Sequence, residues 1–254
     1  MTLPSSLRLI LRNKGYATMA VACLALAISL NTTMYSVIDS LMYPKMTLHE
    51  PSRLYRIGFI GDFRRKIPTA DRRAALLTAT SFAGMARSAG GIAPFVERGN
   101  VVRQATASTV TPNYFAVVGA KPLHGRLLSP GDENVEPQPV VLGERIWSQL
   151  FPNRTTFDTG TVLVNGEPRM VIGVVDRFRH FPSARTDMWQ LPATNDSTFR
   201  AGMLSLVRLK DGVDQKQAWD ELEHIRGRLV AAANADPADS RFNLTPAEGQ
   251  PFKF

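Results

Sequence analysis

Residues 17–38 read ATMAVACLALAISLNTTMYSVI, and no charged residue occurs between Gly15 and Ile38. A helix needs about 20 mostly apolar residues to cross the hydrocarbon core of a bilayer, and this run meets that length. Its mildly polar members include serine, threonine and asparagine, whose side chains can bond within the helix or to a neighbouring helix. The pattern therefore predicts a transmembrane helix over residues 16–42, and its many small residues suit close packing against further helices.

Charged residues flank this run unequally. Arg8, Arg12 and Lys14 precede it, whereas Asp39 follows it. Because positively charged flanks stay on the cytoplasmic side of a membrane, we expect a cytoplasmic N-terminus and an external chain after the helix. Residues 1–15 interleave leucine and isoleucine with arginine, which predicts a short amphipathic segment on the cytoplasmic surface.

Two other interpretations of the apolar run stay open. Ala25-Leu26-Ala27 imitates the small-residue cleavage pattern of a secretory signal peptide, and the run could also be a buried helix of a soluble domain. A signal peptide has an apolar core of about 7–15 residues, whereas this run continues well past Ala27. An uncleaved membrane anchor is therefore the preferred interpretation.

Composition indicates an ordinary folded region beyond the anchor. The chain has 254 residues, of which 44% are hydrophobic and 20% charged, and this length suffices for one large domain or two small ones. The formal net charge is +8, but lysine and arginine are spread along the sequence without a nucleic-acid motif. We therefore expect a solvated basic surface and no nucleic-acid partner. The single cysteine, Cys23, lies inside the apolar run, so an internal disulfide and a Cys/His metal site are excluded.

Both ends of the external region show the same order of elements. Hydrophobic periodicity predicts, in two groups, a strand at 54–60, a helix at 72–89 ended by Gly90-Gly91, and strands at 95–98 and 101–110 joined at Gly99-Asn100; then a strand at 203–209, a helix at 215–233 capped by Asp214, and a strand at 241–245. Two strand–helix–strand units on one sheet form a ferredoxin-like α+β layer. The sequence thus predicts an α+β fold.

A different segment, residues 111–200, lies between these two groups. It predicts a helical turn at 111–115, a strand at 139–142, a helix at 144–151 and a hairpin at 161–175. Asn165-Gly166 in that hairpin is the residue pair that a type I′ turn prefers. We therefore expect one subdomain formed by residues 50–110 and 201–250, with a small α/β subdomain of residues 111–200 inserted into it.

The sequence offers no constellation of residues for catalysis. No two of the four histidines have the spacing of metal ligands, these being His49, His124, His180 and His224. A phosphate-binding glycine loop, a dinucleotide fingerprint and a nucleophile elbow do not occur in the sequence. Glu221 and Glu223 lie two apart on a predicted helix and so point to different faces. We therefore predict no catalytic, cofactor-binding or metal-binding residue.

Residues 176–182 mix arginine and histidine with phenylalanine. Such a mixture can bind a single nucleic-acid strand, but it is also typical of a loop that leaves a strand, and we interpret it as a loop. A membrane-anchored domain without an active site is expected to bind, couple or scaffold. The sequence therefore favours a protein that is not an enzyme.

Six short motifs follow one another along the chain. They are LRLILRNKGY (7–16), LALAISLNTTMYSV (24–37), PSRLYRI (51–57), VTPNYFAVVG (110–119) with Gly125-Arg126, LGERIWSQLF (142–151) and VNGEPRMVIGV (164–174). Each motif alone is weak, but six in this order are a strong signal, and they cover nearly the whole chain. Together they resemble the N-terminal half of MacB/FtsX-type ABC transporter permeases, with their periplasmic core domain.

The resemblance implies a non-catalytic permease subunit of the bacterial inner membrane, with a cytoplasmic N-terminus and a periplasmic main domain. In this family a cytoplasmic ATPase dimer drives the transmembrane helices, and the motion reaches a periplasmic domain that handles substrates or partner proteins. The implied partners are an ABC ATPase subunit, the remaining permease transmembrane helices, a second copy in a homodimer, and a periplasmic adaptor. One part of the family's domain is similar to the porter subdomains of efflux pumps, and it corresponds to residues 50–110 and 201–250.

The chain also departs from this family. Such permeases carry three further membrane spans after the domain, whereas no second apolar run precedes Phe254. We therefore expect a fragment of a longer permease or a truncated product, because these residues alone cannot form a four-span permease. A stand-alone, membrane-anchored periplasmic binding or scaffold protein is the alternative function. An exported enzyme is the weakest hypothesis.

Overall fold

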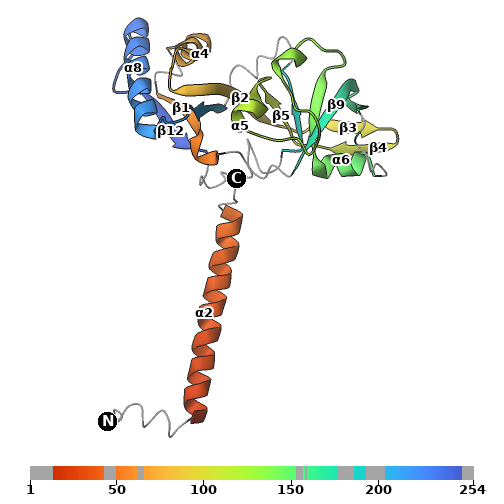
Figure 1. The fold of residues 1–254 in the computed structure, drawn as a ribbon, viewed down its shortest axis with the longest axis vertical. Helices are drawn as coiled ribbons and strands as arrows, with labels where there is room; N and C mark the ends of the chain where they lie inside the picture. Colours follow the sequence, from red (N-terminus) through yellow and green to blue (C-terminus); the bar gives the residue numbers. More distant parts are fainter. Residues whose placement is uncertain are drawn as a thin grey trace. The chain divides into compact units, whose positions relative to one another are not determined.

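The chain forms two units, Met1–Lys45 with Pro251–Phe254, and Met46–Gln250. The computed structural model describes residues 14–42, 50–61, 66–152, 157, 159–176, 186–192 and 204–247. Figure 1 shows the elements of both units.

In the first unit the described residues form the helix α2 (Lys14–Met42), which has 29 residues (Figure 1). Its segment Thr18–Ser36 has a mean hydropathy of 1.4, and none of it is buried within the protein. The hydroxyls of Thr32 and Thr33 donate to main-chain carbonyl oxygens one turn earlier, over 2.8 and 2.7 Å, so the helix itself satisfies these polar groups. By length and composition α2 can cross a membrane, and the predicted N-terminal apolar helix is confirmed.

The second unit begins with a layer of antiparallel sheet and two helices. The elements are β1 (Leu54–Gly61), α4 (Thr69–Leu77), β2 (Phe82–Ile92), β11 (Leu204–Leu209), α8 (Gln215–Ala233) and β12 (Ser240–Pro246). Their strands lie in the order β12-β1-β11-β2, and every neighbouring pair is antiparallel. Two strand–helix–strand units therefore interleave in one layer, and the predicted α+β fold class is confirmed.

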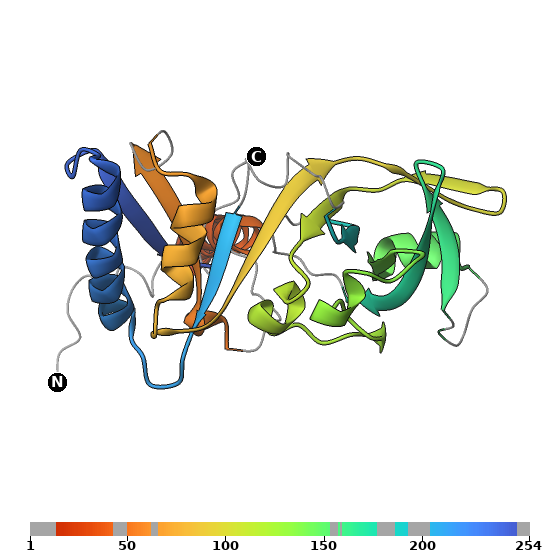
Figure 2. The ribbon, with the colours of Figure 1, turned by 90° about the horizontal axis from the view of Figure 1, so that it is seen from above.

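The helices α4 and α8 lie side by side against this layer (Figure 2). Side chains such as Ile57 of β1 and Leu222 of α8 form the core between helices and sheet. At the start of α8, the carboxylate of Asp214 accepts a hydrogen bond from the Gln217 amide at 2.7 Å. The Gln217 side chain accepts one from the Asp214 amide at 3.0 Å. This capping box confirms the predicted start of the helix at Gln215.

The predicted helix at 72–89 is wrong in its second half, because α4 stops early and β2 takes the remaining residues. Alanine and leucine favour a helix locally, but β2 pairs with strands on both sides, and this pairing outweighs the local preference. The turn before β2 is also fixed by α8. The carboxylate of Glu221 accepts hydrogen bonds from the amides of Thr80 and Ser81 at 2.6 and 2.8 Å.

Beyond β2 the sheet continues in the order β5-β10-β7-β9-β8-β3-β4, and β6 pairs with β9 off this path. The bounds are β3 (Phe95–Arg98), β4 (Val101–Gln104), β5 (Ala107–Val110), α5 (Tyr114–Val118), β6 (His124–Gly125), η2 (Pro130–Asp132), β7 (Pro139–Gly143), α6 (Glu144–Leu150), β8 (Gly160–Val164), β9 (Glu167–Val175) and β10 (Met188–Gln190). These elements form the second part of the unit.

Two predictions in this second part have different outcomes. Asn165 and Gly166 have φ angles of 50° and 85°, and a type I′ turn requires positive φ at both positions, so the β8–β9 hairpin is confirmed. The predicted strand at 101–110 is instead two strands, because β4 pairs with β3 whereas β5 pairs with β2 and β10. At the break between them, the amide of Thr106 donates to the Asp187 carboxylate at 3.0 Å.

The long strand β2 runs through both parts of the second unit (Figure 2). Its residues up to Ser88 pair with β11, and those from Ser88 onward pair with β5. One core cluster draws on both parts and includes Leu54, Ala86, Leu206, Tyr114, Phe115 and Trp189. The β3–β4 hairpin, which belongs to residues 50–110, pairs with β8. The division into subdomains at the predicted boundaries stays a prediction.

Candidate functional site

The chain enters the second unit through a short turn, Glu50 followed by the 3₁₀ helix η1 (Pro51–Arg53). We call residues 50–53 the incoming turn. Glu50 has left-handed backbone angles, φ 46° and ψ 64°, which are uncommon for a residue with a side chain. Pro51 takes the first helical position, where its missing amide hydrogen has no partner to lose. Since Leu54 of β1 follows directly, the turn fixes where the first strand begins.

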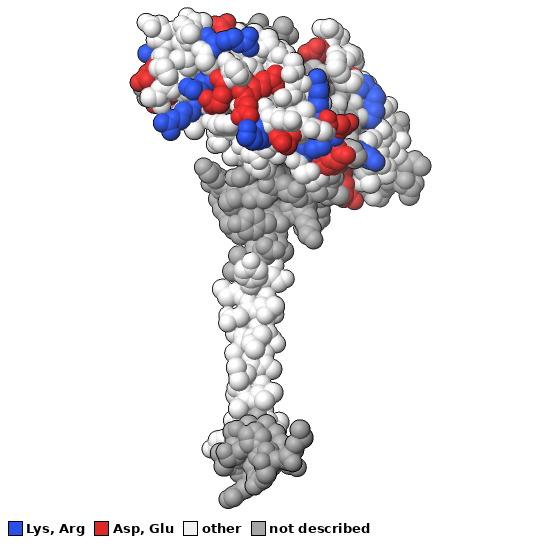
Figure 3. Space-filling model, turned by 60° about the vertical axis from the view of Figure 1, so that its left-hand side comes forward, with Lys and Arg blue, Asp and Glu red and all other residues white. Residues whose placement is uncertain are grey.

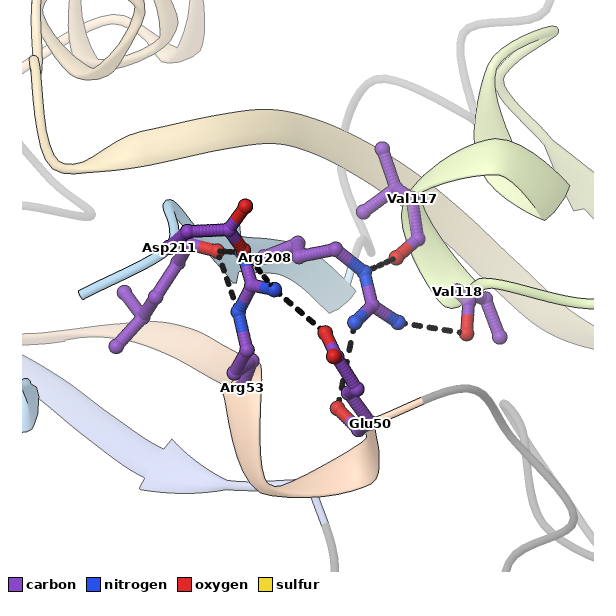
Figure 4. Close-up of polar contacts among 7 residues, drawn as sticks. Glu50, Arg53, Val117, Val118, Arg208 and Asp211 are labelled. Carbon is purple, nitrogen blue, oxygen red and sulfur yellow. Dashed lines mark hydrogen bonds and ion pairs between the residues drawn. The ribbon is translucent and has the colours of Figure 1, made fainter. Parts of the chain in front are cut away.

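Charged side chains from several elements meet at this turn (Figure 4). We call the group the arginine junction, and it consists of Glu50, Arg53, Arg208 and Asp211 with the carbonyl groups of Val117, Val118 and Leu209. The carbonyl groups belong to the ends of α5 and β11. The junction therefore connects the incoming turn to both parts of the sheet.

Arg53 binds the end of β11 and two carboxylates. Its Nε and Nη2 atoms donate to the carbonyl oxygen of Leu209 at 3.1 and 2.6 Å. Its Nη1 atom donates to Oε2 of Glu50 at 2.5 Å and forms an ion pair with Asp211. The side chain of Arg53 is 25% exposed, whereas that of Asp211 is 91% exposed. Arg53 thus fastens the incoming turn to the end of β11 through the Leu209 carbonyl group and to the exposed Asp211 just after it, while its ion pair with Glu50 lies within the turn.

Each hydrogen bond that Figure 4 draws from Arg208 ends on a main-chain carbonyl oxygen. Its Nε and Nη2 atoms donate to the carbonyl oxygens of Val117 and Val118 at 2.7 and 3.0 Å, and its Nη1 atom to that of Glu50 at 3.3 Å. The carbonyl groups at a helix C-terminus lack partners within the helix and attract cations. Burial lowers the pKa of Arg208, Arg53 lowers it further, and Glu50 raises it. Since an arginine pKa lies far above neutrality, Arg208 remains a cation.

The chain enters and leaves the sheet at one end. Leu54, at the start of β1, lies opposite Arg208, near the end of β11. The next residue, Tyr55, lies opposite Pro246 at the end of β12, and the amide of Ala247 donates to the Leu54 carbonyl oxygen at 2.8 Å. The start of β1 therefore lies between the ends of β11 and β12, next to the incoming turn.

Charge elsewhere on the second unit is mixed. Figure 3 shows acidic and basic side chains interspersed over one face of it. Among the residues that the structure describes, no group of three or more His, Cys, Asp or Glu could hold a metal ion. In the described part of the chain, neither the mixed charge nor the distribution of possible metal ligands indicates another candidate site.

The structure separates the polar residues that the sequence analysis considered. His124 stacks on Phe157 with ring centroids 6.3 Å apart, while His224 is exposed on α8, and His49 and His180 lie outside the described residues. Glu221 binds the turn before β2, whereas Glu223 pairs with Arg226 at 2.7 Å. Most of the loop at 176–182 also lies outside the described residues. The absence of catalytic and cofactor residues stays a prediction.

No local pattern in the sequence indicates the arginine junction as a whole. The alternation along β11 does indicate that Arg208 is unusual. Arg208 follows the fully buried Leu206 by two positions, so both side chains lie on the same face of the sheet. A charged residue on the buried face of a strand needs a polar partner. The identity of that partner, the end of α5, is not readable from a local pattern.

The chain matches a known protein family. Residues 17–225 match the family described as MacB-like periplasmic core domain. The protein named "Macrolide export ATP-binding/permease protein MacB" from Salmonella typhi is 32% identical over 133 residues, covering 50% of this chain and 20% of that protein. The protein of the same name from Escherichia coli (strain K12) is 30% identical over 131 residues, with the same coverage of both chains. The match thus spans about a fifth of the length of these relatives.

Solved structures show the same fold. The crystal structure of the periplasmic region of MacB from Actinobacillus actinomycetemcomitans has a TM-score of 0.56 at 23% identity, covering 78% of this chain and 90% of that one. The extracellular domain of the noncanonic ABC-type transporter YknZ from Gram-positive bacteria has a TM-score of 0.55 at 12% identity, covering 76% and 99%. At these identities the likeness concerns the fold alone. Since the family match covers most of the chain, this protein belongs to the family of the MacB-like periplasmic core domain.

Proposed function

We propose that the chain is a non-catalytic permease subunit, or the N-terminal part of one, of a MacB/FtsX-type ABC transporter. In this proposal α2 crosses the inner membrane with its N-terminus in the cytoplasm, and the second unit lies in the periplasm. The domain would receive movement driven by cytoplasmic ATP hydrolysis and use it on a substrate or partner protein. Its partners would be an ABC ATPase subunit, further permease helices, a second copy of the chain and a periplasmic adaptor.

The match of residues 17–225 to the MacB-like periplasmic core domain carries this proposal, and the arginine junction supports its mechanical part. The chain that follows α2 reaches the sheet at residues 50–53, where side chains bind the ends of β11 and α5. Contacts to both elements would let a displacement of the turn act on β11 and on α5 together.

The core of the second unit supports the same function. Trp189 of β10 and Phe115 of α5 pack edge-to-face with centroids 5.9 Å apart, in the cluster that also contains Leu54 at the start of β1. Close-packed protein interiors have low compressibility and transmit strain. A displacement of the incoming turn would therefore reach the second part of the sheet and not stop in the first.

Membrane orientation provides the first test. In a Cys23→Ala background, Asn100→Cys places a thiol in the exposed β3–β4 turn, and Ser5→Cys places one before α2. A membrane-impermeant maleimide should label Asn100→Cys in intact cells, and should label Ser5→Cys only after the membrane is permeabilised. The reverse pattern would contradict the proposed orientation.

Recovery of an ATPase provides the second test. The tagged chain is extracted from its native membrane, and the proteins recovered with it are identified by mass spectrometry. An ABC ATPase subunit in the recovered complex supports a transporter role. External labelling of Asn100→Cys without any ATPase would instead favour the stand-alone periplasmic binding or scaffold protein.

A further inference from the structure

The sheet layer that packs against α4 and α8 has a second face, and polar side chains gather on it. On β1 the side chain of Ile57 belongs to the core under the helices, so the neighbouring Arg56 points to the opposite face. Thr245 of β12 lies directly opposite Arg56 in the strand register. Asn243 of β12 lies opposite Gly58, which is the next residue of β1 on this face. Two adjacent strands therefore place an arginine, a threonine and an asparagine around one glycine.

Arg56 carries a hydrogen-bond donor that the fold does not use. Its Nε atom is buried and has no hydrogen-bond partner in the described part of the chain. Burial lowers the pKa of Arg56, but an arginine pKa lies so far above neutrality that the side chain keeps its charge. A buried donor without a partner costs free energy, and the cost is larger for a charged group. An anionic ligand on this face would offset that cost.

The surroundings of Arg56 favour such a ligand. On this face the described strands β12, β1 and β11 present no aspartate or glutamate. Arg241 adds a second positive charge, since it is exposed and lies opposite Ile60 on the same face. A Cβ at Gly58 would meet Asn243 alone, with its Cβ 3.6 Å away, and Asn243 itself is exposed. The glycine therefore leaves an open position beside Arg56.

The types of donor indicate which anion fits. A guanidinium group binds two oxygens of a carboxylate or a phosphate, and the threonine hydroxyl and the asparagine amide are further donors. Donors from three side chains suit a phosphate group better than a carboxylate, because a carboxylate has only two oxygens. We propose that Arg56, Asn243 and Thr245 form a binding site for a phosphate group above Gly58. Two sources share this chemistry, a phospholipid headgroup and a soluble phosphate.

Nuclear magnetic resonance of the whole chain in uncharged maltoside micelles tests the site, with isotope labels only in the arginine side chains. Arg56→Gln identifies the guanidinium signal of Arg56 by its loss. Inorganic phosphate, compared with sodium chloride at equal ionic strength, should shift this signal saturably. The signal of Arg228 is the internal control, because Arg228 is exposed on α8, which packs against the other face of the layer. It should show no saturable shift.

Matched variants separate a built site from general charge attraction. Gly58→Val keeps every charge but fills the position beside Arg56, and it should weaken phosphate binding by about tenfold or more. Arg228→Gln removes a charge from the other face and should change the dissociation constant by less than about twofold, since solvent screens a distant exposed charge. Circular dichroism shows whether each variant is folded. If Gly58→Val unfolds the chain, Asn243→Ala removes one exposed donor and should weaken binding instead.

Nanodiscs distinguish the two sources of phosphate. A shift of the Arg56 signal when phosphatidic acid is added to phosphatidylcholine nanodiscs, without inorganic phosphate, supports a lipid headgroup as the ligand. A saturable response to inorganic phosphate alone supports a soluble phosphate.

Two results would overturn the site. One is the lack of a saturable shift of the Arg56 signal in both media. The other is a shift that persists unchanged in the folded Gly58→Val and Asn243→Ala variants, because net charge and not the site would then attract phosphate. The site does not depend on the proposed function, and its test needs no ATPase. A failure of the site therefore leaves the transporter role open, and a chain that recovers no ATPase can still bind phosphate.

Discussion

The Nε atom of Arg208 lies 2.7 Å from the carbonyl oxygen of Val117, although the two residues are 91 positions apart in the sequence. Arg208 is on β11 and Val117 is in the last turn of α5, so this bond joins the two parts of the sheet next to the incoming turn. Removal of the guanidinium would leave carbonyl groups at the end of α5 without this charged donor.

The first prediction concerns the stability that this bond supplies. Arg208→Ala should lower the free energy of unfolding by about 1.5–3 kcal/mol, the range for hydrogen bonds to a charged group. Urea unfolding of the chain in detergent micelles, followed by tryptophan fluorescence, measures this loss, since Trp189 is buried in the shared core. Arg241→Ala is the matched control and should change the value by less than about 0.5 kcal/mol. Equal losses in the two variants would contradict the role given to Arg208.

The second prediction is that the fold loses stability in acid when Glu221 becomes protonated. Burial raises its pKa, but hydrogen bonds from Ser81 and Thr80 outweigh burial and lower the pKa from 4.5 to about 2. Because the folded-state pKa lies below the unfolded value, the carboxylate stabilises the fold fully above pH 4.5. That contribution is lost as the pH falls towards 2.

The comparison of Glu221→Gln with the unmodified chain measures this effect. The melting temperature of the unmodified chain should exceed that of the variant at pH 6, and the difference should shrink steadily as the pH falls from 4.5 to 2.5. Circular dichroism melts at each pH give both values. A difference that stays constant over this interval would show that the Glu221 charge does not stabilise the fold.

The third prediction is that removal of the negative charge of Asp132 lowers the free energy of unfolding. Arg126 donates to both its carboxylate oxygens at 2.7 Å, and the Ser129 amide donates to it at 2.8 Å. The bonds from Arg126 lower the pKa of the buried Asp132, while burial opposes them. Asp132→Asn should therefore cost about 1–3 kcal/mol in the free energy of unfolding.

An exposed ion pair offers the control for Asp132. Lys216 donates to Asp220 at 2.7 Å on the surface of α8, with side chains 81% and 59% exposed. Lys216→Gln should leave the urea midpoint unchanged, because solvent screens such pairs. If the two substitutions shift the midpoint equally, burial does not distinguish the two pairs.

The fourth prediction is that substitution by alanine has opposite effects on stability at two glycines. A Cβ at Gly173 of β9 would lie 1.9 Å from the carbonyl oxygen of Arg126, whereas one at Gly227 of α8 would meet nothing within 4 Å. Gly173→Ala should cost about 1–3 kcal/mol or more, as overpacking does. Gly227→Ala should add about 0.5–1 kcal/mol, because alanine is the better helix former. Thermal melts of the two variants would contradict this if both shifts had the same sign.

Local signals were sufficient for several elements. The start of α8 was predictable from Asp214, because a capping box needs only residues one turn apart. The β8–β9 hairpin was predictable from Asn165-Gly166, because its turn type depends on those two residues. The six motifs were also enough to indicate the family that the comparison confirms over residues 17–225.

Other features depended on distant partners. The segment 82–89 has the composition of a helix, but β11 and β5 pair with it on either side and make it a strand. The β3–β4 hairpin was readable as a hairpin, yet its pairing with β8 involves Val96 and Val164, which are far apart in the sequence. The arginine junction is of the same kind, since no pattern around Arg53 or Arg208 names its partner.

The sequence by itself determined that this protein has an N-terminal apolar helix and an α+β domain, because length, hydrophobic period, caps and turn residues act within a few positions of one another. Only the tertiary structure decided which strands share the sheet and how the incoming turn is held. Those choices depend on hydrogen bonds and packing between residues such as Arg208 and Val117, which the chain brings together only when the whole domain folds.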